Sequence, residues 1–257
     1  MISKSTEKLI RSLEHKKYRM QHGLFVAEGR KTVLDLMRRY EPVRVFSTRA
    51  DDEAETVTAE ELRRLSLLQH PQDMLALFRL PRYEQTPEEC RGRFLSRPHT
   101  ISDDLCLALD GIQDPGNLGT IIRTADWFGI SDIICSRDTA DAFAPKVVQA
   151  SMGSLARVSL TYTDLSGFLA TLDTGIRVYG TFPDGSNIYR QRLHGNGIIV
   201  MGNEGKGISD AVQQRVTERL SIPSYAPSHG DSLNVAIATA VVCAEFRRQA
   251  SQPAPLS

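Results

Sequence analysis

The sequence has few cysteines, and their positions exclude the usual cysteine-based structures. Its four cysteines are scattered along the chain and show no C-x-x-C spacing. Cys106, Cys135 and Cys243 lie inside apolar runs, where a thiol behaves as a small hydrophobic side chain. We therefore expect neither a disulfide framework nor a metal site.

Long hydrophobic runs are also absent. No stretch approaches the roughly 18 apolar residues that a membrane-spanning helix needs. The N-terminus lacks the apolar core of a signal peptide. The sequence therefore predicts a cytoplasmic protein in a reducing compartment, without a membrane partner.

Neither sign of charge dominates. The 31 Lys and Arg residues balance 31 Asp and Glu residues, so the net charge gives no indication of a polyanionic partner. The charge is unevenly placed, because residues 1–40 carry ten basic and four acidic side chains. A basic end on a neutral chain is a weak indicator of nucleic-acid binding. A solvated helix face explains it equally well.

At 257 residues the chain can form one large domain or two small ones. In residues 1–82 helical and strand-like segments alternate, which predicts a small α/β domain. Residues 83–104 become polar and irregular, with two prolines, and are the best candidate for a linker. In residues 105–250 apolar strands alternate with helices, which predicts a mainly parallel sheet covered on both faces. We expect residues 251–257 to be a disordered tail.

The pattern also places the individual elements. The N-terminal half opens with a polar amphipathic segment over 6–17, followed by apolar or strand-like segments at 24–29, 43–48 and 74–81 and helices at 30–39 and 59–68. The predicted C-terminal strands are 105–111, 132–136, 156–162, 177–182, 197–202 and 219–224. The predicted C-terminal helices are 118–128, 145–151, 164–172, 209–218 and 232–248. The last helix is apolar nearly all round, so we expect it to be buried, with Ser232 or Asp231 as its N-cap.

Three segments, 109–129, 200–209 and 222–236, share one design, in which a strand ends, a glycine- or proline-rich loop follows and a helix begins. In open α/β sheets ligands bind beyond the carboxyl ends of the strands, so the three loops should meet at one site. The sequence does not match either of two common nucleotide-binding motifs. Ile208 stands where a P-loop needs lysine, and the glycine-rich run at 195–200 precedes a strand instead of a helix.

The helix predicted at 118–128 carries an arginine on its outer face. Its apolar residues fall on one side, and Arg123 lies almost opposite them. Gly119, one turn before Arg123, is expected on the same outer face. A small residue beside an arginine leaves room for a phosphoribose, because the planar guanidinium fork suits phosphate. The ordinary alternative is a solvated arginine that pairs with Asp126.

The three loops resemble the three signature motifs of the SpoU/TrmH branch of the SPOUT RNA methyltransferases. The first motif is matched by residues 117–129, the second by 202–207, and the third by Ile222-Pro223 together with 232–235. Residues 146–154 are similar to the family's stretch between its first two motifs. Residues 1–82 are similar to the small, ribosomal-protein-like substrate-binding domain of that branch.

The resemblance implies a deep trefoil knot in the sheet domain and an obligate homodimer. It also implies a cofactor, S-adenosylmethionine, and a reaction, methylation of a ribose 2′-hydroxyl in structured rRNA or tRNA. Two alternatives stay open. The chain could methylate a base nitrogen, or it could be a catalytically silent RNA-binding or ribosome-assembly protein on the same scaffold.

Carried over residue by residue, the resemblance assigns the site. Its catalytic group comprises Arg123, Asn117, Glu204, Ser232 and Asn234. Its cofactor contacts comprise Thr181, Gly202, Ile222 and Leu233. The basic N-terminal segment adds candidate contacts to the RNA backbone, Lys16, Lys17, Arg19 and Arg30.

Each assigned residue also has a simple structural explanation. Asn117 could be a helix N-cap, and Glu204 could be a carboxylate favoured by a nearby helix start. Asn234 could satisfy a backbone group. Arg123 is unsuited to be a base, because a guanidinium stays protonated in proteins, so we expect an RNA phosphate to accept the proton. The loop over 224–231, which contains His229, is longer than the family pattern.

Overall fold

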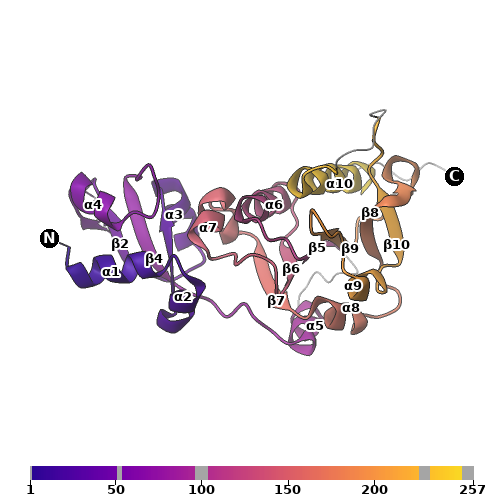
Figure 1. The fold of residues 1–257 in the computed structure, drawn as a ribbon, viewed down its shortest axis with the longest axis horizontal. Coiled ribbons are helices and arrows are strands. Elements are labelled where there is room, and N and C mark those ends of the chain that lie inside the picture. Colours follow the sequence, from indigo (N-terminus) through magenta and orange to yellow (C-terminus); the bar gives the residue numbers. More distant parts are fainter. Residues whose placement is uncertain (1, 51–53, 96–103, 226–231, 251–257) are drawn as a thin grey trace. The chain divides into compact units, whose positions relative to one another are not determined.

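The computed structural model describes residues 2–50, 54–95, 104–225 and 232–250. The chain forms two compact units, which Figure 1 shows as ribbons. The N-terminal unit comprises Met1–Arg82 and Asp141–Arg157, and the C-terminal unit comprises Tyr83–Ala140 and Val158–Ser257. The sequence pattern predicts residues 141–157 within the C-terminal domain, and the structure differs. In the structure they pack with the N-terminal residues, because Phe143 contacts the rings of Phe25 and Tyr40.

The N-terminal unit is built on a four-stranded sheet of order β1-β4-β2-β3. Strand β4 runs antiparallel to both of its neighbours, and β2 and β3 are parallel. The strands are β1 (Leu24–Glu28), β2 (Pro42–Ser47), β3 (Glu55–Thr56) and β4 (Met74–Arg79). The helices are α1 (Lys4–Ser12), α2 (Lys16–His22), α3 (Arg30–Met37), α4 (Ala59–Leu65) and α7 (Pro145–Ser151), with a 3-10 turn η1 (Ser154–Ala156).

The two faces of this sheet are both buried. Alternate residues of a strand point to opposite faces, so Val26 and Phe25 belong to different layers. Val26 packs in a cluster with Ile10 of α1 and Leu62 of α4. Phe25 stacks on Phe78 of β4, on the face that holds Tyr40 and Phe143.

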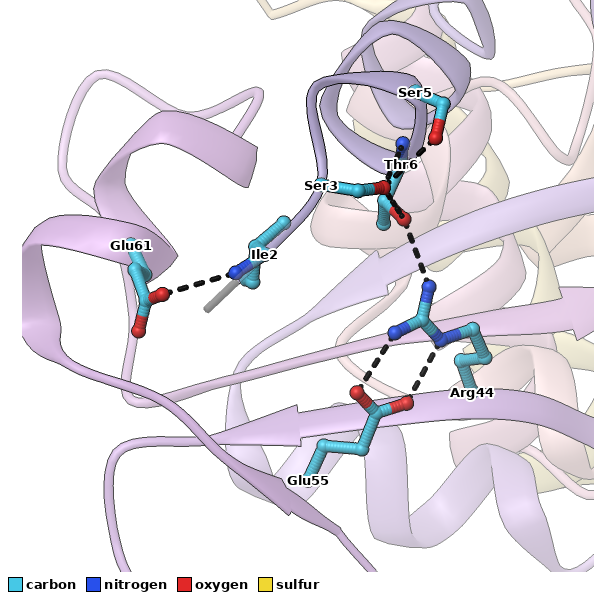
Figure 2. A network of polar contacts seen from close by, with 7 residues as sticks. All are labelled: Ile2, Ser3, Ser5, Thr6, Arg44, Glu55 and Glu61. Atoms are coloured by element: carbon cyan, nitrogen blue, oxygen red, sulfur yellow. Dashed lines mark hydrogen bonds and ion pairs between the residues drawn. The ribbon is translucent and has the colours of Figure 1, made fainter.

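Polar contacts tie α1 to β2 and β3 at one corner of the unit (Figure 2). Arg44 binds Glu55 through two parallel bonds, Nε to Oε1 at 2.8 Å and Nη2 to Oε2 at 2.7 Å. Its third nitrogen, Nη1, donates to Thr6 Oγ1 at 2.9 Å. This paired arginine lowers the pKa of the Glu55 carboxyl below its usual value. The corner is therefore held by a bidentate ion pair, the stronger form of such contacts.

The C-terminal unit contains a six-stranded sheet of order β10-β8-β9-β5-β6-β7, in which every neighbouring pair is parallel. This confirms the parallel sheet expected from the sequence. Its strands are β5 (Leu105–Asp110), β6 (Asp132–Ser136), β7 (Ser159–Thr163), β8 (Val178–Asn187), β9 (Gly197–Gly202) and β10 (Glu218–Ser221). Its helices are α5 (Pro87–Leu95), α6 (Pro115–Trp127), α8 (Leu165–Ala170), α9 (Asp210–Gln213) and α10 (Val235–Ala250), with a 3-10 turn η2 (Ile188–Arg190).

The predicted irregular linker is wrong over residues 87–95, which form α5. Thr86 and Glu89 cap its start reciprocally, since Glu89 N donates to Thr86 Oγ1 at 3.2 Å and Thr86 N donates to Glu89 Oε2 at 2.9 Å. Cys90 is buried in the core with Leu165 and Phe168 of α8. Residues 96–103 of the predicted linker and the predicted tail 251–257 lie outside the described residues.

The last helix differs from the sequence prediction in two ways. Its N-cap is Asn234, whose Oδ1 accepts from the backbone N of Ala236 at 3.0 Å and of Ile237 at 3.3 Å. Asp231 lies outside the described residues. The helix packs against α6 but is not buried all round, since Ile237 is 56% exposed. No helix in the described ranges is long and apolar enough to cross a membrane.

Candidate active site

The loops that follow β5 and β9 are tied together at the carboxyl edge of the sheet. Asp110, the buried last residue of β5, accepts a hydrogen bond at Oδ2 from the backbone N of Ser209 at 2.7 Å. Asn203, the first residue after β9, donates through Nδ2 to the carbonyl of Gly111 at 2.7 Å. Because the two strands are adjacent and parallel, these bonds hold the first two loops in a fixed register.

Asn203 also shapes the loop that contains Glu204. Its Oδ1 accepts from the backbone N of Gly205 at 2.9 Å and of Lys206 at 3.1 Å, and its backbone pairs with Gly207 in both directions. Sequence reasoning missed the importance of Asn203 and Asp110. An asparagine in a glycine-rich turn was the available signal, because its side chain readily bonds the backbone of its own turn.

Glu204 is the point at which all three loops meet. Its Oε1 accepts from Asn117 Nδ2 at 2.6 Å and from Asn234 Nδ2 at 3.0 Å. Asn234 Nδ2 also donates to Asn117 Oδ1 at 2.9 Å. The structure thus brings three of the sequence-predicted catalytic residues into one hydrogen-bonded junction, which we call the Asn-Glu-Asn junction.

The start of α6 leaves the Asn117 side chain available for this junction. The N-cap of α6 is Asp114, whose Oδ1 accepts from the backbone N of Asn117 at 2.8 Å, and Pro115 occupies the first helical position. Asn117 is therefore not the N-cap that its sequence position also allowed.

A pocket of about 330 Å³ opens beside the junction. Its described lining is Glu204, Ser232, Leu233 and Asn234. Leu233 is 51% exposed there, an apolar side chain without cover among polar neighbours. The volume of this pocket falls at the lower end of the 300–1,000 Å³ that is usual for ligand pockets.

Comparison with known proteins assigns the chain to a family. Residues 104–244 match the model of the SpoU rRNA Methylase family, and residues 5–76 match that of the MRM3-like substrate binding domain. The chain belongs to the SpoU family. The resemblance seen in the three loops is thereby confirmed.

Two curated relatives show how far the similarity extends. The chain is 34% identical over 143 residues to 23S rRNA (guanosine(2553)-2'-O)-methyltransferase RlmP of Bacillus subtilis, over 55% of this chain and 57% of that protein. It is 33% identical over 196 residues to an uncharacterized tRNA/rRNA methyltransferase of Synechocystis, over 75% of this chain and 66% of that protein. The alignments thus span less than two thirds of these relatives.

Solved structures match nearly the whole chain. A TrmH-family protein of Porphyromonas gingivalis superposes with a TM-score of 0.83 and 40% identity, over 97% of this chain and 99% of that one. An AdoMet-bound rRNA methyltransferase from Sinorhizobium meliloti gives a TM-score of 0.81 and 28% identity, over 96% of each chain. Both support the α/β fold with its parallel sheet.

Within this SpoU fold, Arg123 lies exposed on the outer face of α6. The expectation for Gly119 is wrong, because it is buried in the structure. The outer face of α6 is instead continued by Thr120 and Trp127, both exposed.

The predicted cofactor residues Thr181 and Gly202 occupy β8 and β9, and Ile222 directly follows β10. These three strands are adjacent and parallel, so the residues approach the same edge of the sheet. Thr181 Oγ1 donates to the carbonyl of Val200 at 3.2 Å. A Cβ at Gly202 would lie 2.4 Å from the backbone of Gly207, so only glycine fits there.

The predicted RNA contacts divide into two groups. Lys16 and Lys17 are exposed on α2. The prediction is wrong for Arg19, which is 2% exposed and whose Nη2 lies 2.5 Å from Asp141 Oδ2. Arg30 is half-buried and binds Asp73 and Ser47 within its own unit. No group of three or more His, Cys, Asp or Glu side chains among the described residues could hold a metal ion.

Proposed function

We propose that this protein transfers a methyl group from S-adenosylmethionine to a ribose 2′-hydroxyl in structured rRNA or tRNA. The observation that carries the proposal is the Asn-Glu-Asn junction, which joins the three SpoU motif loops beside one pocket. The names of the relatives support it, since RlmP of Bacillus subtilis is a guanosine 2′-O-methyltransferase of 23S rRNA.

The residues at the pocket suit the cofactor. An exposed leucine offers apolar surface to an adenine ring, and at Gly202 the chain packs too closely on Gly207 to admit a side chain. In this proposal Thr181, Gly202, Ile222 and Leu233 hold the cofactor. When bound, S-adenosylmethionine supplies an electrophilic methyl group.

Arg123 binds the RNA in this proposal. Its exposed guanidinium offers a planar set of donors to a phosphate and to the 2′-oxygen, and holds that oxygen in line for attack. Such positioning contributes roughly 7–11 kcal/mol to displacement reactions in general. Because Arg123 stays protonated, the hydroxyl proton passes to an adjacent RNA phosphate. Asn117 and Glu204 fix the loops, while Ser232 and Asn234 position the ribose.

Replacement of Arg123 tests this assignment. Arg123→Ala should bind S-adenosylmethionine as the wild type does in a calorimetric titration, yet lose about 100-fold or more in methyl transfer to RNA. The matched control is Arg192→Ala, which removes another exposed arginine of the same unit and should leave both quantities unchanged. Near-normal transfer by Arg123→Ala would contradict the role. If the wild type binds no cofactor, the chain is a silent scaffold.

We further propose a homodimer that covers the exposed apolar side chains of α6 and α10. Trp127 is 85% exposed and Ile237 is more than half exposed, although both lie on helices that pack against each other. The proposal rests on the family resemblance, which implies a dimer, together with these two exposed side chains.

The finer features of the SpoU architecture are proposed on the family resemblance. Residues 105–250, apart from 141–157, would form the methyltransferase domain, with β10 and α10 threaded into a trefoil knot. Residues 1–82 would form the substrate-binding domain, which the model match over 5–76 supports. The cytoplasmic location stays a prediction.

A further inference from the structure

Helix α2 of the N-terminal unit carries a stripe of exposed rings beside two lysines. His15, Tyr18 and His22 are spaced three and four residues apart, so they follow one side of the helix. The rings of Tyr18 and His22 are nearly parallel, with 22° between their planes and centroids 6.4 Å apart. His15 meets Tyr18 edge-on, with centroids 6.3 Å apart.

These rings are exposed to solvent. Tyr18 is 37% exposed and Met20, also on α2, is 48% exposed, while both histidines fall in the exposed class. The three rings on one side of this helix leave flat faces open to a ligand. A ligand with flat apolar faces would supply the missing cover.

The surroundings of the rings favour an anionic ligand. Lys16 and Lys17 are exposed on the same helix, and Lys17 Nζ lies 6.0 Å from the centre of the Tyr18 ring. Helix α2 itself contains no acidic residue. Flat rings beside exposed lysines match a single-stranded nucleic acid, whose bases stack on aromatic faces while its phosphates contact lysine.

A buried clamp holds α2 in place. Arg19 donates through Nη1 to the carbonyls of Leu13 at 2.7 Å and Glu14 at 2.8 Å, and pairs with Asp141. These bonds fix the short helix to the chain segment before it and to residue 141. The rings therefore stand on a rigid support, which lowers the entropy lost when a ligand binds.

We propose that Tyr18 and His22 form a stacking platform for unpaired bases of the RNA substrate, with Lys16 and Lys17 on the adjoining phosphates. The inference rests on the proposed RNA substrate and specifies it further. It requires the RNA to present splayed-out bases near the target, since paired bases within a duplex are not available for stacking.

Fluorescence anisotropy with a labelled RNA of mixed sequence tests the platform, using the strand alone and annealed to its complement. Stacking is worth about 1–3 kcal/mol per base, so Tyr18→Ala should weaken single-strand binding by about 5- to 150-fold. Duplex binding should not change. Tyr18→Phe keeps the ring and should stay within about twofold of the wild type. The matched control, Tyr189→Ala, removes an exposed tyrosine of the other unit and should have no effect.

Salt dependence separates stacking from charge. Lys17→Ala should reduce the slope of log affinity against log salt by about 0.7, the value for one phosphate contact on a single strand. Tyr18→Ala should lower the affinity without changing that slope. Alanine is the best helix former, so both variants should keep α2 intact, which circular dichroism checks.

The outcomes distinguish this inference from the proposed function. If Tyr18→Ala binds the single strand as tightly as the wild type does, the platform is wrong, even where methyl transfer is found. If Tyr18 matters for RNA binding but the wild type neither binds S-adenosylmethionine nor methylates RNA, the platform stands and the enzymatic proposal fails.

Discussion

A double-mutant cycle on Asn117 and Glu204 measures how much the Asn-Glu-Asn junction contributes to the affinity of the pocket that we propose for the cofactor. The two side chains come from different loops, and Asn117 Nδ2 lies 2.6 Å from Glu204 Oε1. Hydrogen bonds to a charged group contribute about 1.5–3 kcal/mol. Glu204 is exposed and Asn117 half-buried, so water replaces part of the lost bond, and we expect about 1 kcal/mol for this pair.

We expect the junction to favour cofactor binding by holding the three loops together. A variant in which they are open part of the time binds more weakly, in proportion to its closed fraction. We expect Asn117→Ala to weaken the affinity for S-adenosylmethionine about fivefold. Glu204→Ala should weaken it about tenfold or more, because Oε1 also binds Asn234. Each 1.4 kcal/mol corresponds to a factor of ten.

Calorimetric titration of the four proteins gives the coupling. The double variant should bind about fivefold more tightly than the product of the single effects predicts, a coupling of about 1 kcal/mol. The control cycle uses Arg91 and Asp173, an exposed ion pair at 3.3 Å located before the amino end of β8, and should show no coupling. Strictly additive effects of Asn117→Ala and Glu204→Ala would refute the reasoning.

Three further predictions follow from buried or exposed groups. Arg19→Ala leaves Asp141 buried without its partner, so the free energy of unfolding should fall by about 3–5 kcal/mol in urea denaturation; a neutral effect would mean that the clamp is not structural. Burial raises the pKa of Glu28 above its ordinary value of 4.5, so the folded state favours the protonated form. The stabilisation by that proton is complete below the ordinary pKa and is lost as the pH rises through the folded one. Glu28→Gln should therefore gain in stability relative to the wild type between acidic and neutral pH in paired denaturation curves, and parallel pH profiles would contradict this. Trp127→Asp combined with Ile237→Asp should convert a dimer into a monomer in sedimentation analysis, and an unchanged mass would place the interface elsewhere.

The sheet was predictable from the sequence because its inner strands are continuous apolar runs. All six residues of β5 are buried, and so are the first five of β9, as expected for strands covered on both faces. Such runs carry their own signal, independent of contacts with distant residues. Each of the six predicted strands therefore overlaps an observed one. The bounds differ most at β7, which begins three residues later than predicted, at β8, which continues to Asn187, and at β10, which ends at Ser221.

Features that depend on distant partners were not predictable in this way. The burial of Arg19 could not be predicted, because its partner Asp141 lies 122 residues away in the sequence. From local sequence alone, Arg19 is one more cation in a basic segment. Gly119 was placed on the outer face of α6 by helical period alone, which cannot say what packs against the helix. For α5 a local signal existed, the Thr86–Glu89 capping pair, but the prolines and polar composition outweighed it.

The candidate site also combines features that the sequence predicts with features that only the structure shows. Family motifs pointed to Asn117, Glu204 and Asn234, and these three are hydrogen-bonded to one another. Their assigned roles stay predictions. The structure also shows two roles that the motifs did not indicate. Asn234 is the N-cap of α10, and Asn203 holds the backbone of its own loop.

The most direct test of the central claim is the chemical position of the transferred methyl group. The purified protein is incubated with S-adenosylmethionine and RNA from cells that lack it, and the RNA is digested to nucleosides for mass spectrometry. Our account predicts a new nucleoside whose added methyl group stays on the ribose fragment. A methyl group on the base fragment, or cofactor binding without any methylated nucleoside, would contradict it.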